Sequence, residues 1–137
     1  EEENNIKKLV DELNLNNQVI FIKNISNNLK NALVAKSNIF IMPSIIHKKS
    51  VEGFGIAFIE AAQHGIPSIG GKDGGASDAI IHEKTGLICD GNNLEEVYAS
   101  IDQLLKNHTY KEYGKLAKEN SQKFHWNKII EEYKRIL

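Results

Sequence analysis

Residues 38–70 read NIFIMPSIIHKKSVEGFGIAFIEAAQHGIPSIG, and this stretch decides the fold. It opens with a short apolar run that Pro43 stops, which predicts a buried strand over residues 38–44. After a polar loop, residues 55–63 have the apolar spacing of a helix, and IPSIG at residues 66–70 predicts a second strand. A strand, a helix and another strand in this order predict two parallel strands joined by a right-handed crossover.

The helix in this stretch carries its apolar residues at a spacing that defines one face. We expect Ile56, Ile59 and Ala62 to point into the core. Gly65 is well placed to end the helix, because a glycine accepts the left-handed conformation that commonly follows a last helical turn.

The same alternation extends in both directions along the chain. Upstream, the pattern predicts a helix up to Leu13, a strand buried on both faces at QVIFI (residues 18–22), and a helix capped by Ser26. Downstream, it predicts irregular backbone through GGKDGG, a short helix over residues 76–82 and a strand at TGLICD. These elements together predict an α/β domain in which helices cover both faces of a parallel sheet.

From Leu94 onward the pattern is helical, in three successive segments. Aromatic residues should anchor the last of them by packing. The apolar face of the first segment is formed by Leu94, Val97, Ile101, Leu104 and Leu105, and the anchors are Phe124, Trp126 and Tyr133.

The size and charge of the chain narrow the functional classes. Its 137 residues suit one domain, spanning residues 1–137, and its net charge of -1 provides no basic field to attract nucleic acid. Cys89 is the only cysteine, which excludes an internal disulfide, and its apolar neighbours predict a buried thiol. No apolar run approaches the roughly 20 residues of a membrane span, so we expect a cytosolic protein.

Two glycine-rich loops follow neighbouring strands, SVEGFG at residues 50–55 and GGKDGG at residues 70–75. Ligands of open parallel sheets bind beyond the carboxyl ends of the strands. The backbone amides of Phe54, Gly55 and Ile56 open a helix and can hold an anion there. A glycine such as Gly53 or Gly55 alone predicts only a turn, but two such loops together favour close approach by a phosphate and a sugar.

Several common chemistries are disfavoured by the motifs. GGKDGG does not fit the G-x-x-x-x-G-K-[ST] phosphate loop, and no G-x-G-x-x-G opens a first strand and helix. The five histidines show no i, i+4 pair, so we expect no metal site and no cofactor. Ser77 lacks the G-x-S-x-G context of a hydrolase nucleophile.

Residues 50–89, SVEGFGIAFIEAAQHGIPSIGGKDGGASDAIIHEKTGLIC, closely resemble the donor-binding segment of retaining GT-B glycosyltransferases of family 4. The hallmark of that family is Glu, seven residues, Glu, and here these are Glu52 and Glu60. The flanking NQVIFI, NIFIMPS and FHWNKIIEEY agree with the same pattern. The resemblance implies a Rossmann-like three-layer domain with a parallel sheet, which forms the C-terminal half of a GT-B fold.

The resemblance also implies roles for individual residues. Glu52 would contact hydroxyls of the transferred sugar as the catalytic residue, and Glu60 would accept hydrogen bonds from the ribose. Gly53 and the amides of Phe54, Gly55 and Ile56 would face the diphosphate or the sugar.

The second glycine-rich loop would complete the donor site. Gly74, Gly75 and Asp78 would line it from that side. The donor would be a GDP- or UDP-sugar, bound as substrate without a metal.

The chain departs from the family pattern in three ways. Lys23 stands where a glycine is usual, and Asp78 replaces the more frequent Glu. A preceding strand, basic residues that grip the diphosphate and an N-terminal acceptor-binding domain are not in the sequence, so we expect a piece of a longer two-domain protein that cannot transfer sugar alone.

Three functions remain open on this sequence. The first is a hexosyltransferase, mannosyltransferase-like in its GGKDGGASDAI loop, that acts on a glycan or lipid acceptor, with peripheral membrane association at the inner face through the missing domain. The second is a non-enzymatic nucleotide-binding regulatory domain. The third is a related GT-B sugar epimerase or phosphorylase.

Overall fold

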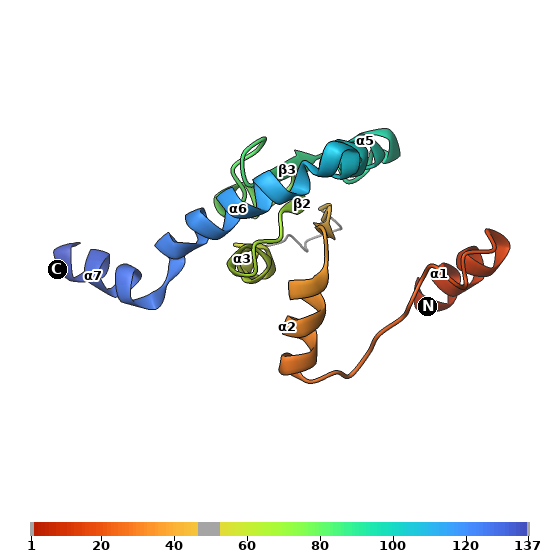
Figure 1. Ribbon diagram of the computed structural model, residues 1–137, viewed down its shortest axis with the longest axis horizontal. Coiled ribbons are helices and arrows are strands. Elements are labelled where there is room, and N and C mark those ends of the chain that lie inside the picture. Colours follow the sequence, from red (N-terminus) through yellow and green to blue (C-terminus); the bar gives the residue numbers. More distant parts are fainter. Residues whose placement is uncertain (1, 47–52, 137) are drawn as a thin grey trace. The chain divides into compact units, whose positions relative to one another are not determined.

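The computed structural model describes residues 2–46 and 53–136. The chain divides into two compact units, Glu1–Lys30 and Asn31–Leu137 (Figure 1). That the whole chain forms one domain stays a prediction.

The first unit begins with helix α1 (Glu2–Glu12), as its apolar spacing predicts. Val10 is its buried residue, and the Val10 carbonyl accepts a hydrogen bond of 2.9 Å from the Leu15 amide in the turn that follows. The predicted strand at residues 18–22 is wrong, because this segment has irregular backbone and Ile20 is 80% exposed. An apolar run forms a strand only beside a second strand, and no described strand pairs with this one.

A cluster of charges joins α1 to this irregular segment. Glu3 contacts Lys7 at 2.8 Å and also pairs with Lys23. The hydrogen bond from Lys23, with a second from Lys7, lowers the pKa of the Glu3 carboxyl to about 2.

Helix α2 (Asn27–Lys36) follows, and Ser26 caps it as predicted: the Leu29 amide donates to Ser26 Oγ at 3.3 Å. The remaining elements alternate strands and helices. In chain order they are β1 (Phe40–Met42), α3 (Ile56–Gln63), β2 (Ser68–Gly71), α4 (Ala76–Ala79), β3 (Gly86–Cys89), α5 (Leu94–Leu105), the 3-10 helix η1 (Lys106–His108), α6 (Tyr110–Ser121), the 3-10 helix η2 (Gln122–Phe124) and α7 (Trp126–Ile136).

The three strands form a parallel sheet in the order β1-β2-β3, which confirms the predicted α/β class. Ile41 of β1 lies opposite Ile69 of β2, which lies opposite Leu87 of β3. Because both pairings are parallel, all three strands point their carboxyl ends toward the same edge. The handedness of the crossovers stays a prediction.

Helices cover both faces of the sheet, as predicted (Figure 1). One core cluster joins Phe58 and Ile59 of α3 and residues of α4 to Phe40, Met42 and Ile88 of the strands. The other face carries Ile69, Leu87 and Cys89, which pack with Leu104 of α5. The sheet therefore alternates strictly, since neighbouring strand residues serve opposite cores.

Helix α3 begins and ends as predicted, and Gly65 has the left-handed φ of 76° expected after its last turn. Its predicted inward face is wrong in one respect, because Ile56 is 69% exposed while Phe58 is buried. Phe58 packs edge-on against Phe40 of β1, with ring centroids 5.9 Å apart. The largest apolar side chain takes the position facing the sheet and turns Ile56 outward.

Two predictions for the C-terminal helices are also wrong. Leu94 is 82% exposed, because it opens α5 before the helix reaches the core that Leu104 fills. Trp126 and Tyr133 are exposed rather than packing anchors, whereas Phe124 is half-buried against the α3 core. Across the described residues, no helix combines the length and apolar character that spanning a membrane requires.

Candidate functional site

The carboxyl edge of the sheet gathers the loops that follow β1, β2 and β3. Their backbones pack closely: a Cβ placed on Gly71, at the end of β2, would lie 1.9 Å from the Ser44 carbonyl oxygen. Only a glycine permits this contact, so the loop after β1 lies directly on the end of β2. This is the edge at which open parallel sheets bind ligands.

The two glycine-rich loops meet at this edge. A Cβ on Gly75 would lie 1.6 Å from the Gly53 carbonyl oxygen and 2.9 Å from Phe54 Cα. The neighbouring loop thus leaves no space for a side chain at Gly75. Gly53 differs, because a Cβ there would meet nothing within 4 Å. Gly74 has a φ of 95°, which suits a glycine at that turn.

Helix α3 starts at this meeting of loops. Gly55 is its N-cap, with a left-handed φ of 74°, and the Phe58 amide donates to the Gly55 carbonyl at 2.9 Å. A Cβ on Gly55 would lie only 2.5 Å from the Phe58 ring, which is too close for a side chain. The sequence therefore needs glycine at this start, and the helix presents its first backbone amides beyond the strand ends.

A groove of about 460 Å³ runs along the outer side of α3. It contains three of the predicted site residues, Phe54, Ile56 and Glu60, on one wall. Phe124 and Trp126 stand on the other wall, and the rings of Phe54 and Phe124 meet edge-on with centroids 5.7 Å apart. The structure thus brings an apolar wall, a carboxylate and a helix start together.

The remaining predicted residues occupy different places. Asp78 is exposed in the short helix α4, which follows Gly75. Glu52, the predicted catalytic residue, lies outside the described residues, as does His47. Their roles stay predictions, and so do the roles of Gly53, Gly74 and Gly75 toward a ligand.

Comparison with known proteins identifies the family. The model of the family described as "Glycosyl transferases group 1" matches residues 1–124. The chain belongs to this glycosyltransferase family.

Individual relatives agree with this assignment. A GDP-mannose-dependent alpha-(1-6)-phosphatidylinositol monomannoside mannosyltransferase of Mycobacterium tuberculosis is 33% identical over 102 residues, which are 73% of this chain and 26% of that protein. The structure of a sucrose-phosphate synthase from Thermosynechococcus elongatus superposes with a TM-score of 0.83 at 27% identity, covering 98% of this chain and 33% of that one.

A further solved structure shows the same fold. Anabaena HepE in complex with UDP-glucose matches with a TM-score of 0.74 at 19% identity, over 88% of this chain and 32% of its own. The predicted Rossmann-like domain of a GT-B glycosyltransferase is therefore confirmed. The chain spans about a quarter to a third of the length of these three proteins.

The structure of this glycosyltransferase domain adds two residues that sequence reasoning missed. Lys72 and Asp90 begin the loops after β2 and β3, and Lys72 Nζ lies 2.6 Å from Asp90 Oδ2. Their hydrogen bond raises the pKa of Lys72 and lowers that of Asp90. The signal was available, since Lys72 lies two residues after the predicted strand IPSIG, Asp90 is the last residue of the predicted strand TGLICD, and parallel neighbours end at one edge.

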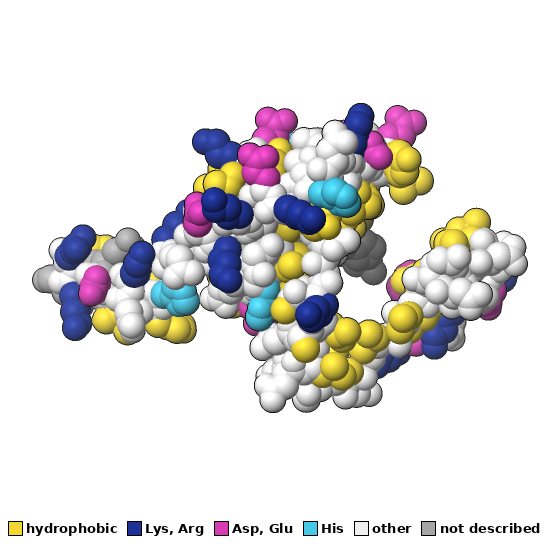
Figure 2. All heavy atoms as spheres, in the orientation of Figure 1, with side chains coloured by type: hydrophobic (Ala, Val, Ile, Leu, Met, Phe, Trp, Pro, Cys, Tyr) yellow, Lys and Arg dark blue, Asp and Glu magenta, His cyan; other side chains and the backbone are white. Residues whose placement is uncertain are grey.

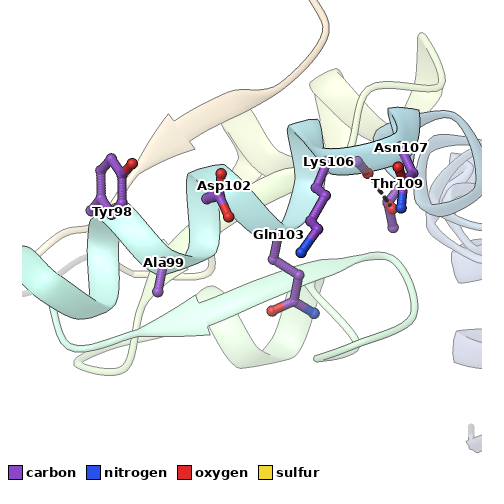
Figure 3. A pocket seen from close by; sticks show the side chains of 7 residues that line it. All are labelled: Tyr98, Ala99, Asp102, Gln103, Lys106, Asn107 and Thr109. Atoms are coloured by element: carbon purple, nitrogen blue, oxygen red, sulfur yellow. Dashed lines mark hydrogen bonds between the residues drawn. The ribbon is translucent and has the colours of Figure 1, made fainter.

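Two other features carry no predicted site residue. Cys89 is buried as predicted, and burial raises the pKa of its thiol. A pocket of about 470 Å³ lies on α5 and the turn after it, where Tyr98, Asp102, Gln103 and Lys106 line it (Figure 3). It stands apart from the glycine-rich loops.

Charge and metal-binding groups are dispersed in the described part of the domain. Figure 2 shows Lys and Arg side chains interspersed with Asp and Glu side chains around α5 and α6. Residues 2–46 and 53–136 contain no group of three His, Cys, Asp or Glu side chains that could hold a metal ion.

Proposed function

We propose that this chain is the donor-binding half of a retaining hexosyltransferase that uses a nucleoside-diphosphate sugar without a metal. An N-terminal domain of the same protein would bind the acceptor, a glycan or a lipid. The observation that carries the proposal is the meeting of both glycine-rich loops at the start of α3, in a chain of this family. The short coverage of its relatives supports a second domain.

The start of α3 supplies the diphosphate site in this proposal. The first amides of a helix have no partner within the helix and carry the positive end of its dipole. Phe54, Gly55 and Ile56 stand at this start, where their amides would face the diphosphate or the sugar. Such fixed dipoles stabilise the negative charge that develops on the leaving diphosphate.

The groove beside α3 would hold the nucleoside. Glu60 lines this groove and would accept hydrogen bonds from the ribose hydroxyls, while Phe54 and Ile56 supply apolar surface. Glu52 would contact the hydroxyls of the transferred sugar. Gly74, Gly75 and Asp78 would complete the site from the second loop.

Names of relatives suggest which donors to test first. The mycobacterial relative is named as GDP-mannose-dependent, and HepE was solved with UDP-glucose. We therefore propose a binding panel of GDP-mannose, UDP-glucose and ADP-glucose, measured by calorimetry on the complete protein. Binding of none of them would overturn the proposal.

Substitution of Glu60 tests the ribose contact. Glu60→Ala should weaken donor binding by about 1–3 kcal/mol, the range for a hydrogen bond to a charged group, or roughly five- to 150-fold. Glu119→Ala is the matched control, because Glu119 is exposed on α6 and lines none of the described pockets. Equal affinity in Glu60→Ala and wild type would exclude the ribose role.

Substitution of Glu52 separates transfer from binding. Glu52→Gln in the complete protein should cut sugar transfer strongly and leave nucleotide binding near normal. A regulatory domain would bind the nucleotide and transfer nothing in either form. Epimerised or phosphorolysed products would point to a related sugar enzyme instead.

A further inference from the structure

The ion pair between Lys72 and Asp90 connects the loops after β2 and β3. Lys72 Nζ lies 2.6 Å from Asp90 Oδ2, and the Lys72 amide donates to the Cys89 carbonyl at 2.8 Å. Lys72 is thus tied to the end of β3 by its backbone and by its side chain.

Asp90 is a fixed partner in this pair. Its Oδ1 accepts a hydrogen bond of 2.9 Å from the Asn92 amide, and its own amide donates to Glu96 Oε2 at 2.9 Å. Glu96 is held by Asn93, whose side chain donates to it at 3.1 Å and caps α5. The anchor for Lys72 is therefore the capped start of a long helix.

The pair contributes little to the stability of the fold. The Lys72 side chain is 56% exposed and the Asp90 side chain 22%, and exposed ion pairs stabilise proteins only slightly. Its main consequence is local, because three residues beyond Lys72 the loop reaches Gly75. Gly75 lies against Gly53 and Phe54, where a Cβ would be 1.6 Å from the Gly53 carbonyl oxygen.

We propose that Lys72 and Asp90 are positioning residues of the donor site, because their ion pair fixes the loop of residues 72–75 against the start of α3. This inference rests on the proposed function. The pair acts through the loop and through the Gly75 contact with Gly53 and Phe54, so neither member needs to touch the donor.

The two variants Lys72→Met and Asp90→Asn test this role in the complete protein, by calorimetry with GDP-mannose and UDP-glucose. Each should weaken donor binding by about two- to fivefold, because the loop can lose no more order than so exposed an ion pair supplies. The double variant should bind no more weakly than either single variant, because both break the same pair.

A conservative variant and thermal unfolding exclude a general loss of structure. Lys72→Arg keeps the charge and should restore donor affinity to within about twofold of wild type. The melting temperature should change only slightly in all four variants, because an exposed pair adds little stability. A large loss of melting temperature in Lys72→Met that accounts for the lost affinity would overturn the proposal.

Direct contact of Lys72 with the donor predicts a different pattern. Asp90→Asn would then release Lys72 and leave donor binding unchanged or tighter, while Lys72→Met would weaken it. That result would overturn the positioning role.

Hydrogen exchange keeps the inference separate from the proposed function. If wild type binds no nucleotide-sugar, the proposed function fails, but residues 72–75 of the ligand-free protein should still exchange faster in Lys72→Met and Asp90→Asn than in wild type and Lys72→Arg. Equal exchange in all forms would overturn the positioning role by itself.

Discussion

Gly75→Ala would force the two glycine-rich loops apart. The added Cβ would lie 1.6 Å from the Gly53 carbonyl oxygen and 2.6 Å from its carbon, and neither atom belongs to a flexible side chain. The loops would have to separate by about 2 Å to restore an ordinary contact of roughly 3.5 Å. Gly75 has a φ of -84°, which alanine adopts readily, so the effect is purely steric.

We expect two measurable effects of this substitution. Overpacking of this kind costs about 1–3 kcal/mol of unfolding free energy, which denaturant unfolding would measure. The displaced start of α3 should also reduce kcat/KM for sugar transfer by about a hundredfold, as misplacement by about 1 Å can do in an enzyme.

Gly53→Ala is the stability control for this prediction. A Cβ on Gly53 meets no atom within 4 Å, so this variant should unfold within about 0.5 kcal/mol of wild type. If Gly75→Ala were as stable as wild type, or if both variants lost equal stability, the close contact between the loops would be refuted.

Three further predictions concern the rest of the chain. Leu104→Ala should lose about 2–5 kcal/mol of unfolding free energy, because Leu104 is fully buried, whereas Leu94→Ala should be nearly neutral at its exposed position. Equal losses of the two variants in denaturant unfolding would contradict the burial of Leu104 in the core. The lowered pKa of Glu3 stabilises the fold at pH values above 4.5, the ordinary pKa of this carboxyl, and the contribution should disappear as the pH falls from about 4.5 to about 2. In Lys23→Ala, carboxyl NMR should show the pKa of Glu3 rising toward 4.5. An unchanged pKa would exclude the ion pair between Glu3 and Lys23. Asn93→Ala should cost about 0.5–2 kcal/mol in thermal unfolding through loss of the α5 cap, and no change in melting temperature would contradict it.

Much of the sheet could be predicted because local sequence marks its boundaries. Pro43 stops β1, Gly65 ends α3 before β2, and Gly86 opens β3. Each short apolar run between such residues forms a strand with a neighbour in the sheet. The run at residues 18–22 has the same composition but no paired strand in the described structure, so its pattern was insufficient.

The faces of helices were harder to predict than their positions. Spacing placed Ile56 inward, but the position of Phe58 against Phe40 determines how α3 turns, and that contact joins residues distant in sequence. Trp126 was assigned to packing by its size alone, and it is 76% exposed. Spacing shows which residues share a face, while the partner of that face comes from tertiary structure.

The candidate site was predicted in part for a similar reason. Glycine-rich sequence after two neighbouring strands correctly predicted that both loops lie at the same edge of the sheet, but not that they touch each other. We expected open backbone at these glycines, but the other loop occupies the space beside Gly75. The pair of Lys72 and Asp90 was missed because its members are 18 residues apart and each looks like an ordinary surface charge.

Hydrogen exchange of the complete protein, with and without saturating GDP-mannose or UDP-glucose, tests the donor-binding role most directly. We predict that donor slows exchange in residues 53–60 and 72–78 and leaves the pocket at residues 98–109 unchanged. Slower exchange confined to residues 98–109, or no change with either donor, would contradict the placement of the donor at the start of α3.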